Sequence, residues 1–180
     1  MTKEILDLSR RLRRLEDRQE LADLIARYGI AVDDRDMNTL GDLFSRSATV
    51  QHSQGRSTGR DAVIAFYRGR LSQFGPTYHY PHTQTIDFLS DEEATGVVAA
   101  HAEMAIGKEA VMAAIRYMDR YVREDGRWKF LERGLRFLYV LPLQELPRFL
   151  SERLRKRWPG TTPAEADLPE TLDTWKAFQK

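Results

Sequence analysis

AVMAAIRYMDRYVREDGRWKFLERGLRFLYV, residues 110–140, carries the clearest strand pattern in the chain. Apolar and polar residues alternate with a period of two on both sides of Glu124-Asp125-Gly126. This period is typical of β-strands, and a connection of that length favours an antiparallel hairpin. We therefore predict strands over Ala110–Arg123 and Arg127–Val140.

Two more strand patterns precede this hairpin, over Thr83–Leu89 and Thr95–Ile106. Short polar connections join them to each other and to residue 110, as in a meander of antiparallel strands. A further strand is predicted at Ser47–His52, followed by a polar turn over residues 53–59.

Helical patterns dominate the first part of the chain. An apolar stripe runs from Leu8 to Val32 among charged neighbours. Asp36 is a predicted N-cap of a second helix, and Asp61 of a third that Gly75-Pro76 brings to an end. Helices followed by meandering strands indicate an α+β fold and not the alternating order of a parallel sheet.

The last part of the chain differs from the rest. Apolar and basic residues from Leu146 to Leu154 predict an amphipathic helix, and the apolar residues after Pro163 are sparse. We divide the chain into a main domain, residues 1–145, and an arm, residues 146–180, that packs on the body or on a neighbouring subunit.

Composition excludes several classes of protein. The 180 residues are 42% hydrophobic, which suffices for one core, and the net charge of +1 does not favour nucleic-acid binding. The absence of cysteine excludes disulfides, thiolate metal centres and a cysteine nucleophile. The charged N-terminus and the lack of a long apolar run lead us to expect a cytoplasmic protein with no membrane partner.

Histidines are the conspicuous reactive residues, because no phosphate-binding or nucleophile-elbow motif is present. His79 and His82 lie in TYHYPHTQTIDF, residues 77–88, which we expect to begin as a loop that enters a sheet edge. A positioned imidazole can act as a base if a carboxylate orients it. Asp33, near the end of the first helix, is the candidate, with Asp34 and Asp36 as rivals.

Other residues are candidates for binding. His101 and Glu103 share a strand face with small residues, which is consistent with a lined cavity or with a solvent-facing pair. Arg133 and Arg136 flank Gly134, a predicted bulge, so either arginine could enter a pocket and bind an anion. The histidines could also ligate a metal, although HxxH in a loop is a weak signal and we predict none.

The whole pattern resembles a known family. RQELADLIARYGIAVDDRDMNTLGDLF (residues 18–44), the TYHYPHT segment and RYVREDGRWKFLERG (residues 120–134) are similar to the SnoaL-like, or polyketide-cyclase-like, branch of the nuclear transport factor 2-like superfamily. The resemblance covers about residues 16–140. It implies a cone-shaped α+β barrel, a strongly curved antiparallel sheet with the N-terminal helices enclosing a pocket.

Within this branch, the match is closest to cofactor-free lyases: bile-acid 7α-dehydratase, scytalone dehydratase and hexachlorocyclohexane dehydrochlorinase. The resemblance implies that His79 removes a proton and that Asp33 orients it. It further implies substrate-binding positions, some of them offset from those of the relatives: Tyr28, His52, His82, His101, Arg133 and Arg136.

Two classes of function follow. The first is a dehydratase-type lyase without cofactor or metal, acting on an apolar, polycyclic or steroid-like small molecule. An isomerase or cyclase would use the same proton abstraction. The second is a non-catalytic small-molecule-binding or structural subunit of the same fold, such as a dioxygenase β-subunit. In either case we expect a homo-oligomer, a trimer in preference to a dimer.

Overall fold

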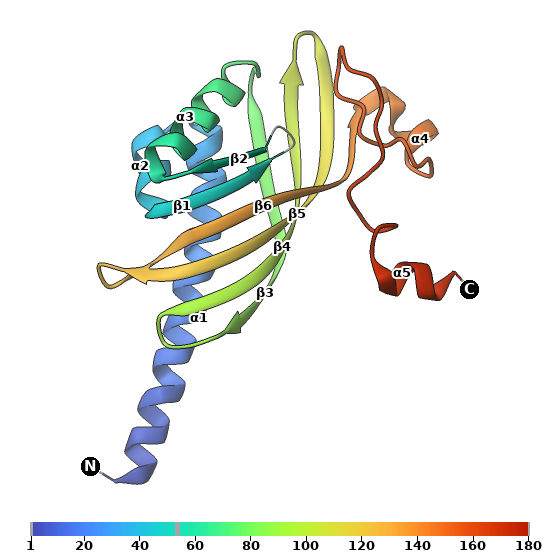
Figure 1. Ribbon diagram of the computed structural model, residues 1–180. Coiled ribbons are helices and arrows are strands. Elements are labelled where there is room, and N and C mark those ends of the chain that lie inside the picture. The colour runs from blue at the N-terminus through green and yellow to red at the C-terminus, as the bar shows by residue number, and fades with distance from the viewer. Residues whose placement is uncertain (1, 53–54, 180) are drawn as a thin grey trace.

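The computed structural model describes residues 2–52 and 55–179 and shows a curved sheet that wraps around a long first helix (Figure 1). This helix, α1 (Lys3–Asp33), begins at Thr2, whose side chain accepts a hydrogen bond from the Ile5 amide. Its buried stripe starts near its middle, at Asp17 and Leu21. The first half of α1 projects beyond the sheet (Figure 1).

The next elements follow the predicted order with two corrections. Helix α2 (Met37–Leu43) is capped by Asp36 as predicted, because Asp36 Oδ1 accepts from the Thr39 amide at 3.0 Å. Helix α3 (Arg60–Leu71) has Gly59 at its N-cap, so the predicted cap at Asp61 is wrong and Asp61 lies in the first turn. There its charge still favours the positive end of the helix dipole.

Strand β1 (Phe44–His52) starts earlier than predicted and pairs with a short strand, β2 (Gly55–Thr58). We predicted a turn for this polar run; residues 53–54 lie outside the described part of the chain. A short edge strand whose side chains are mostly exposed shows no hydrophobic alternation, so the sequence gives no strand signal there.

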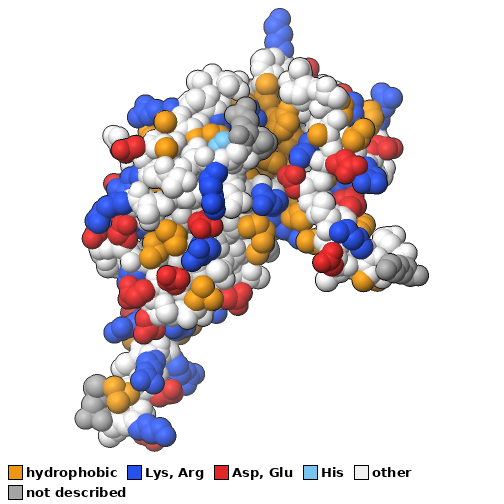
Figure 2. All heavy atoms as spheres, in the orientation of Figure 1, with side chains coloured by type: hydrophobic (Ala, Val, Ile, Leu, Met, Phe, Trp, Pro, Cys, Tyr) orange, Lys and Arg blue, Asp and Glu red, His pale blue; other side chains and the backbone are white. Residues whose placement is uncertain are grey.

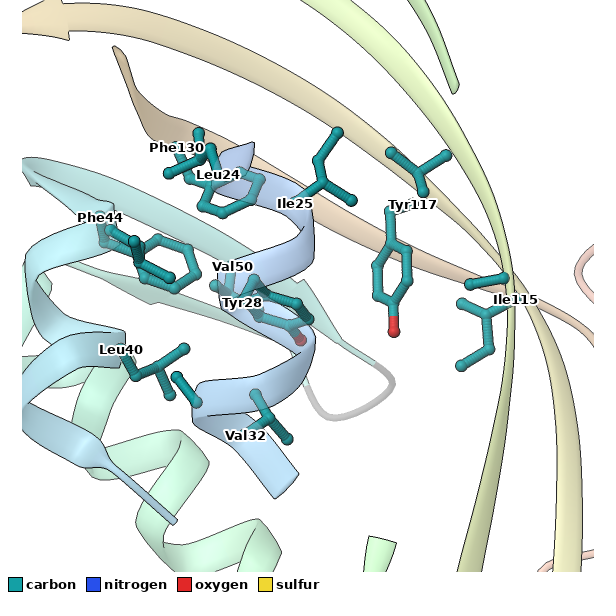
Figure 3. Close-up of a cluster of buried hydrophobic side chains, with 14 of the residues drawn as sticks. Leu24, Ile25, Tyr28, Val32, Leu40, Phe44, Val50, Ile115, Tyr117 and Phe130 are labelled. Atoms are coloured by element: carbon teal, nitrogen blue, oxygen red, sulfur yellow. The ribbon is translucent and has the colours of Figure 1, made fainter. Parts of the chain in front are cut away.

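The four long strands form the body of the sheet: β3 (Thr77–Phe88), β4 (Glu93–Ile106), β5 (Glu109–Glu124) and β6 (Arg127–Pro142). The strand order is β2-β1-β6-β5-β4-β3, and every pairing is antiparallel except that of β1 with β6. The predicted meander and the cone-shaped α+β fold are therefore confirmed. Apolar side chains of α1, α2 and the inner face of the sheet form the core (Figure 3).

Strand β3 corrects the expectation of a loop before Thr83. The chain is already extended and paired with β4 from Thr77 onward, and the register shifts between Pro81 and Thr83. Proline lacks an amide donor, yet it is tolerated here because β3 is an edge strand and lies at an irregularity. Residues 77–82 therefore belong to the sheet.

The C-terminal segment contains little regular structure. The expected amphipathic helix is reduced to η1 (Leu143–Glu145) and α4 (Leu146–Phe149), and α5 (Asp173–Phe178) follows near the end. A bridge between Val140 and Lys156 and a 2.9 Å hydrogen bond from Arg155 Nε to the Leu138 carbonyl attach this segment to β6. Of the helices that the structure describes, none has the length and apolar character to cross a membrane.

Candidate active site

A cavity opens between the helices and the inner face of the sheet. Its walls come from α1, α3, the long strands and the C-terminal segment, and they are largely aromatic and aliphatic. Among the described residues, eight that line the cavity carry a polar side-chain group: Tyr28, His52, Tyr67, Arg70, Thr77, His79, Tyr117 and Trp158. An apolar hollow with a few convergent polar groups is the usual form of a small-molecule site.

Asp33 and His79 meet at this cavity. His79 Nδ1 lies 2.7 Å from Asp33 Oδ1, and the His79 amide donates to Asp33 Oδ2 at 2.7 Å. The last turns of α1 approach β3 closely at Gly29, where a Cβ atom would lie 3.4 Å from the Cβ of His79. The helix therefore lies in van der Waals range of the strand one turn before its terminal carboxylate.

The contact fixes the roles of the two imidazole nitrogens. A carboxylate only accepts hydrogen bonds, so Nδ1 is the donor, and in the neutral form of the ring Nε2 then carries the lone pair. Nε2 has no hydrogen-bond partner among the described residues, and His79 lines the cavity. The neutral imidazole can therefore accept a proton from a molecule in the cavity.

Two residues that the sequence analysis missed hold Asp33 in place. Thr77 Oγ1 donates to Asp33 Oδ1 at 2.8 Å, and Arg35 Nη1 donates to Thr77 Oγ1 at 2.8 Å. Arg35 also binds the Gly75 carbonyl and adopts a left-handed conformation with φ 60°. Burial raises the pKa of Asp33, but its contacts with His79 and Thr77 outweigh this and lower the pKa overall.

The rival carboxylates have other positions. Asp34 is exposed and forms the C-cap of α1, and Asp36 is the N-cap of α2. The structure brings neither into contact with His79.

Tyrosine hydroxyls form a second polar group in the cavity. The Tyr28 and Tyr67 hydroxyl oxygens are 3.0 Å apart, and Tyr117 also lines the cavity. Figure 3 shows Tyr28 on α1 and Tyr117 on β5 projecting into the space between helix and sheet. Burial raises the pKa of Tyr67 and of Tyr117, so these phenols stay protonated. The Tyr28–Tyr67 pair can thus donate one hydrogen bond to a ligand oxygen.

Arg133 lies beneath these tyrosines and does not line the cavity. It is fully buried, and its Nε and Nη2 atoms donate to Asp119 at 2.9 and 2.7 Å. The rings of Tyr28, Tyr117 and Phe130 surround its guanidinium, with centroids 4.0–4.2 Å from Cζ. The expected anion-binding role at Arg133 is therefore corrected to a structural one, because its charge is already paired.

Arg136 faces the opposite side of the sheet. Leu135 and Phe137 line the cavity, so alternation turns the intervening Arg136 outward, where Nη2 lies 3.4 Å from Gln51 Oε1. The expected bulge at Gly134 is absent, since Gly134 pairs in register with Met118. Arg136 therefore has no access to the cavity.

His82 and His101 also lie on the outer face. Ala102 and Met104 of β4 point inward and line the cavity, so His101 points outward. His82 Nε2 lies 2.7 Å from His101 Nδ1, and His101 Nε2 lies 3.1 Å from the Tyr139 hydroxyl. Burial and the nearby His82 lower the pKa of His101. The expectation that these histidines line the cavity is corrected.

His52 does reach the cavity. Its ring stacks on Phe66 with centroids 4.0 Å apart, and Nε2 lies 3.2 Å from Ser57 Oγ. Burial lowers the pKa of His52, so the ring favours its neutral form.

Besides Thr77 and Tyr117, further lining residues were not functional candidates in the sequence analysis. Tyr67 has the spacing of a core residue in α3, Arg70 follows it on the same helix, and Trp158 lies in the irregular C-terminal segment. Periodicity cannot distinguish a cavity wall from a core. Over residues 2–52 and 55–179, no three histidine, aspartate or glutamate side chains cluster in a manner suited to a metal ion.

Residues 13–134 match the SnoaL-like domain. The chain belongs to the SnoaL-like family. It is 28% identical over 137 residues to the gamma-hexachlorocyclohexane dehydrochlorinase of Sphingobium indicum, which covers 73% of this chain and 87% of that protein. Trp158 and the rest of the C-terminal segment lie beyond the matched domain.

Solved structures share the fold of this SnoaL-like protein. The crystal structure of LinA superposes with a TM-score of 0.70 and 26% identity, covering 73% of this chain and 92% of that one. A scytalone dehydratase-like protein of Novosphingobium aromaticivorans gives a TM-score of 0.68 and 27% identity, covering 72% of this chain and 89% of that one. The chain is therefore similar, at low identity, to proteins named as a dehydrochlorinase and as a scytalone dehydratase-like protein.

Proposed function

We propose that this SnoaL-like protein is a lyase that eliminates a small leaving group from a largely apolar, ring-containing substrate without a cofactor. The observation that carries the proposal is the 2.7 Å contact between His79 Nδ1 and Asp33 Oδ1 at the wall of an apolar cavity. The similarity to a dehydrochlorinase supports the same reaction class.

The first half of the reaction is a proton transfer. His79 Nε2 takes a proton from a carbon atom of the substrate, and the electron pair of the broken C–H bond forms the new double bond. The imidazolium that results is stabilised by the negative charge of Asp33, which stays ionised because its pKa is lowered. The apolar walls exclude water and strengthen this interaction.

The second half is the departure of the leaving group with the bonding electron pair. A hydroxide or carbonyl oxygen needs a hydrogen-bond donor as negative charge develops on it. The Tyr28–Tyr67 pair supplies a neutral donor inside the cavity. An isomerase would use the same residues and return the proton to another carbon.

We expect the wild-type protein to accelerate exchange of the α-protons of 2-tetralone in D₂O, because this probe requires proton abstraction but no leaving group. His79→Gln should reduce this acceleration by about 10²–10⁴-fold. Proton NMR measures the exchange, and chloride release from γ-hexachlorocyclohexane measures elimination. His82→Gln is the matched control, since His82 lies on the outer face of the sheet and its replacement should leave both rates unchanged. A wild-type protein inactive on both probes would contradict the proposal.

We also propose that the protein forms a homo-oligomer, and the projecting half of α1 supports this. Ile5, Leu8, Leu12 and Leu15 follow a heptad spacing and are each at least half exposed. In a parallel pairing with a second copy, the g position Arg11 faces the e position Glu16 of the other helix, which is an attractive contact.

Leu12→Glu should therefore shift the protein toward monomer in sedimentation velocity at a fixed concentration. A charge at the centre of the apolar seam would be buried without a partner. Arg10→Glu, on the opposite side of the same helix, should leave the sedimentation coefficient unchanged. A monomeric wild-type protein, or an unaltered Leu12→Glu oligomer, would exclude this interface.

A further inference from the structure

Arg70 is the one arginine or lysine that lines the cavity among the described residues. It lies in the last turn of α3, and its Cζ atom is 4.7 Å from the ring centroids of both Phe74 and Trp158. In Figure 2, hydrophobic side chains gather where the C-terminal segment meets the cone. An arginine thus lies half-buried against an aromatic wall.

The charge of Arg70 is not balanced locally. It forms no ion pair within the described part of the chain, and no aspartate or glutamate lines the cavity there. Its Nη1 atom donates one hydrogen bond, to Gln73 Oε1 at 3.3 Å. A guanidinium has five N–H donors, so most of them remain available for a ligand. Burial also lowers the pKa of Arg70, as expected for a cation that is partly removed from water and has no carboxylate beside it among the residues described.

The surroundings of this charge favour a particular ligand. Carboxylates match the planar fork of a guanidinium with two parallel hydrogen bonds. Phe74 and Trp158 have nearly parallel rings, with an interplanar angle of 4°, and Phe137 meets Trp158 edge-on at 5.5 Å. These rings offer flat apolar surface next to the cation.

We propose that Arg70 binds a carboxylate group of the substrate, so that the substrate class is an apolar, ring-bearing carboxylic acid. This inference rests on the proposed function in that it names the substrate of the same cavity. Trp158 makes the C-terminal segment part of the binding site, because it contributes a wall that the matched domain alone does not contain.

The test compares two probes of nearly equal shape, 2-naphthoate and the neutral 2-naphthamide. Binding is measured by isothermal titration calorimetry at about pH 8, where His52 is uncharged because burial lowers its pKa. The wild-type protein should bind the naphthoate at least about tenfold more tightly than the amide. Arg70→Met should remove this preference, and Arg70→Lys should retain part of it because the charge remains.

Arg68→Met is the matched control, since Arg68 is exposed on the same helix and does not line the cavity. It should keep the full preference for naphthoate. His79→Gln should also keep it, so that loss of the catalytic base and loss of the carboxylate site are separate results. Equal binding of the two probes by the wild-type protein, no binding of either, or an undiminished preference in Arg70→Met would overturn the inference.

Discussion

Asp33→Asn should lower the rates of 2-tetralone exchange and of elimination by about 10²–10⁴-fold while the fold persists. The amide removes the negative charge that stabilises the imidazolium of His79. It can also present its NH₂ group to Nδ1, which would move the histidine proton to Nε2 and occupy the lone pair that the reaction needs. Initial rates with saturating probe, together with far-ultraviolet circular dichroism, measure both parts of this expectation.

Asp34→Asn is the control for Asp33→Asn. Asp34 is the next residue, it is exposed, and it makes no contact with His79. Its replacement should leave the rates within about twofold of wild type. Comparable loss in the two variants would mean that general damage to the end of α1, and not the contact with His79, explains the effect.

Asp33→Asn should also change how the stability of the protein depends on pH in acid. The pKa of Asp33 is lowered from its ordinary value of 3.8, so the folded carboxylate takes up a proton at lower pH than the unfolded one. The stability that this provides is present above about pH 4 and is lost as the pH falls through the folded pKa. The urea midpoint of wild type should therefore decline more than that of Asp33→Asn between about pH 5 and about pH 2.5. Asp36 and Glu170, whose pKa values are also lowered, act equally in both proteins.

Much of the fold could be predicted because its signals are local. The alternation on both sides of Glu124-Asp125-Gly126 depends on the two faces of one hairpin, and the structure has strands at the predicted places. The cap at Asp36 is a contact between residues three apart. Strand β2 and the start of β3 gave no such signal, because exposed edge strands do not alternate.

The candidate site was predictable only in part. The sequence analysis selected the end of α1 and the His79 segment, and the structure brings Asp33 and His79 together. Alternation, however, shows which residues share a face and not which face lines the cavity. For this reason alternation left the sides of His101 and Arg136 open. The resemblance counted both as substrate-binding positions, and the structure places both on the outer face. Arg70 and Trp158 come from segments far apart in the chain, and only the folded structure brings them together.

Arg133→Met should reduce the free energy of unfolding by about 3–5 kcal/mol. The change leaves the carboxylate of Asp119 buried, with the Tyr121 hydroxyl as its remaining side-chain hydrogen-bond donor in the described part of the chain. It also removes the cation from its contacts with Tyr28, Tyr117 and Phe130. Urea denaturation followed by circular dichroism, at a pH where both proteins are folded, measures the difference.

A double variant separates the cost of breaking the Arg133–Asp119 ion pair from the cost of lost packing. Arg133→Met combined with Asp119→Leu removes both charges, so it should recover most of the stability that Arg133→Met loses. Arg120→Met is the surface control, because Arg120 contacts Glu132 at 3.3 Å on the exposed side of the same strands. Its effect should not exceed about 1 kcal/mol.

The Arg133–Asp119 pair lies directly behind the wall of the cavity. Tyr28 and Tyr117 form part of the cavity wall, and the guanidinium of Arg133 packs against both rings from behind. If the double variant folds as stably as wild type yet loses elimination activity, Arg133 positions the tyrosines as well as stabilising the core. Arg133→Met could instead reduce the free energy of unfolding no more than Arg120→Met does. The buried pair would then contribute no more than a surface ion pair, and the tyrosines would depend on their own packing alone.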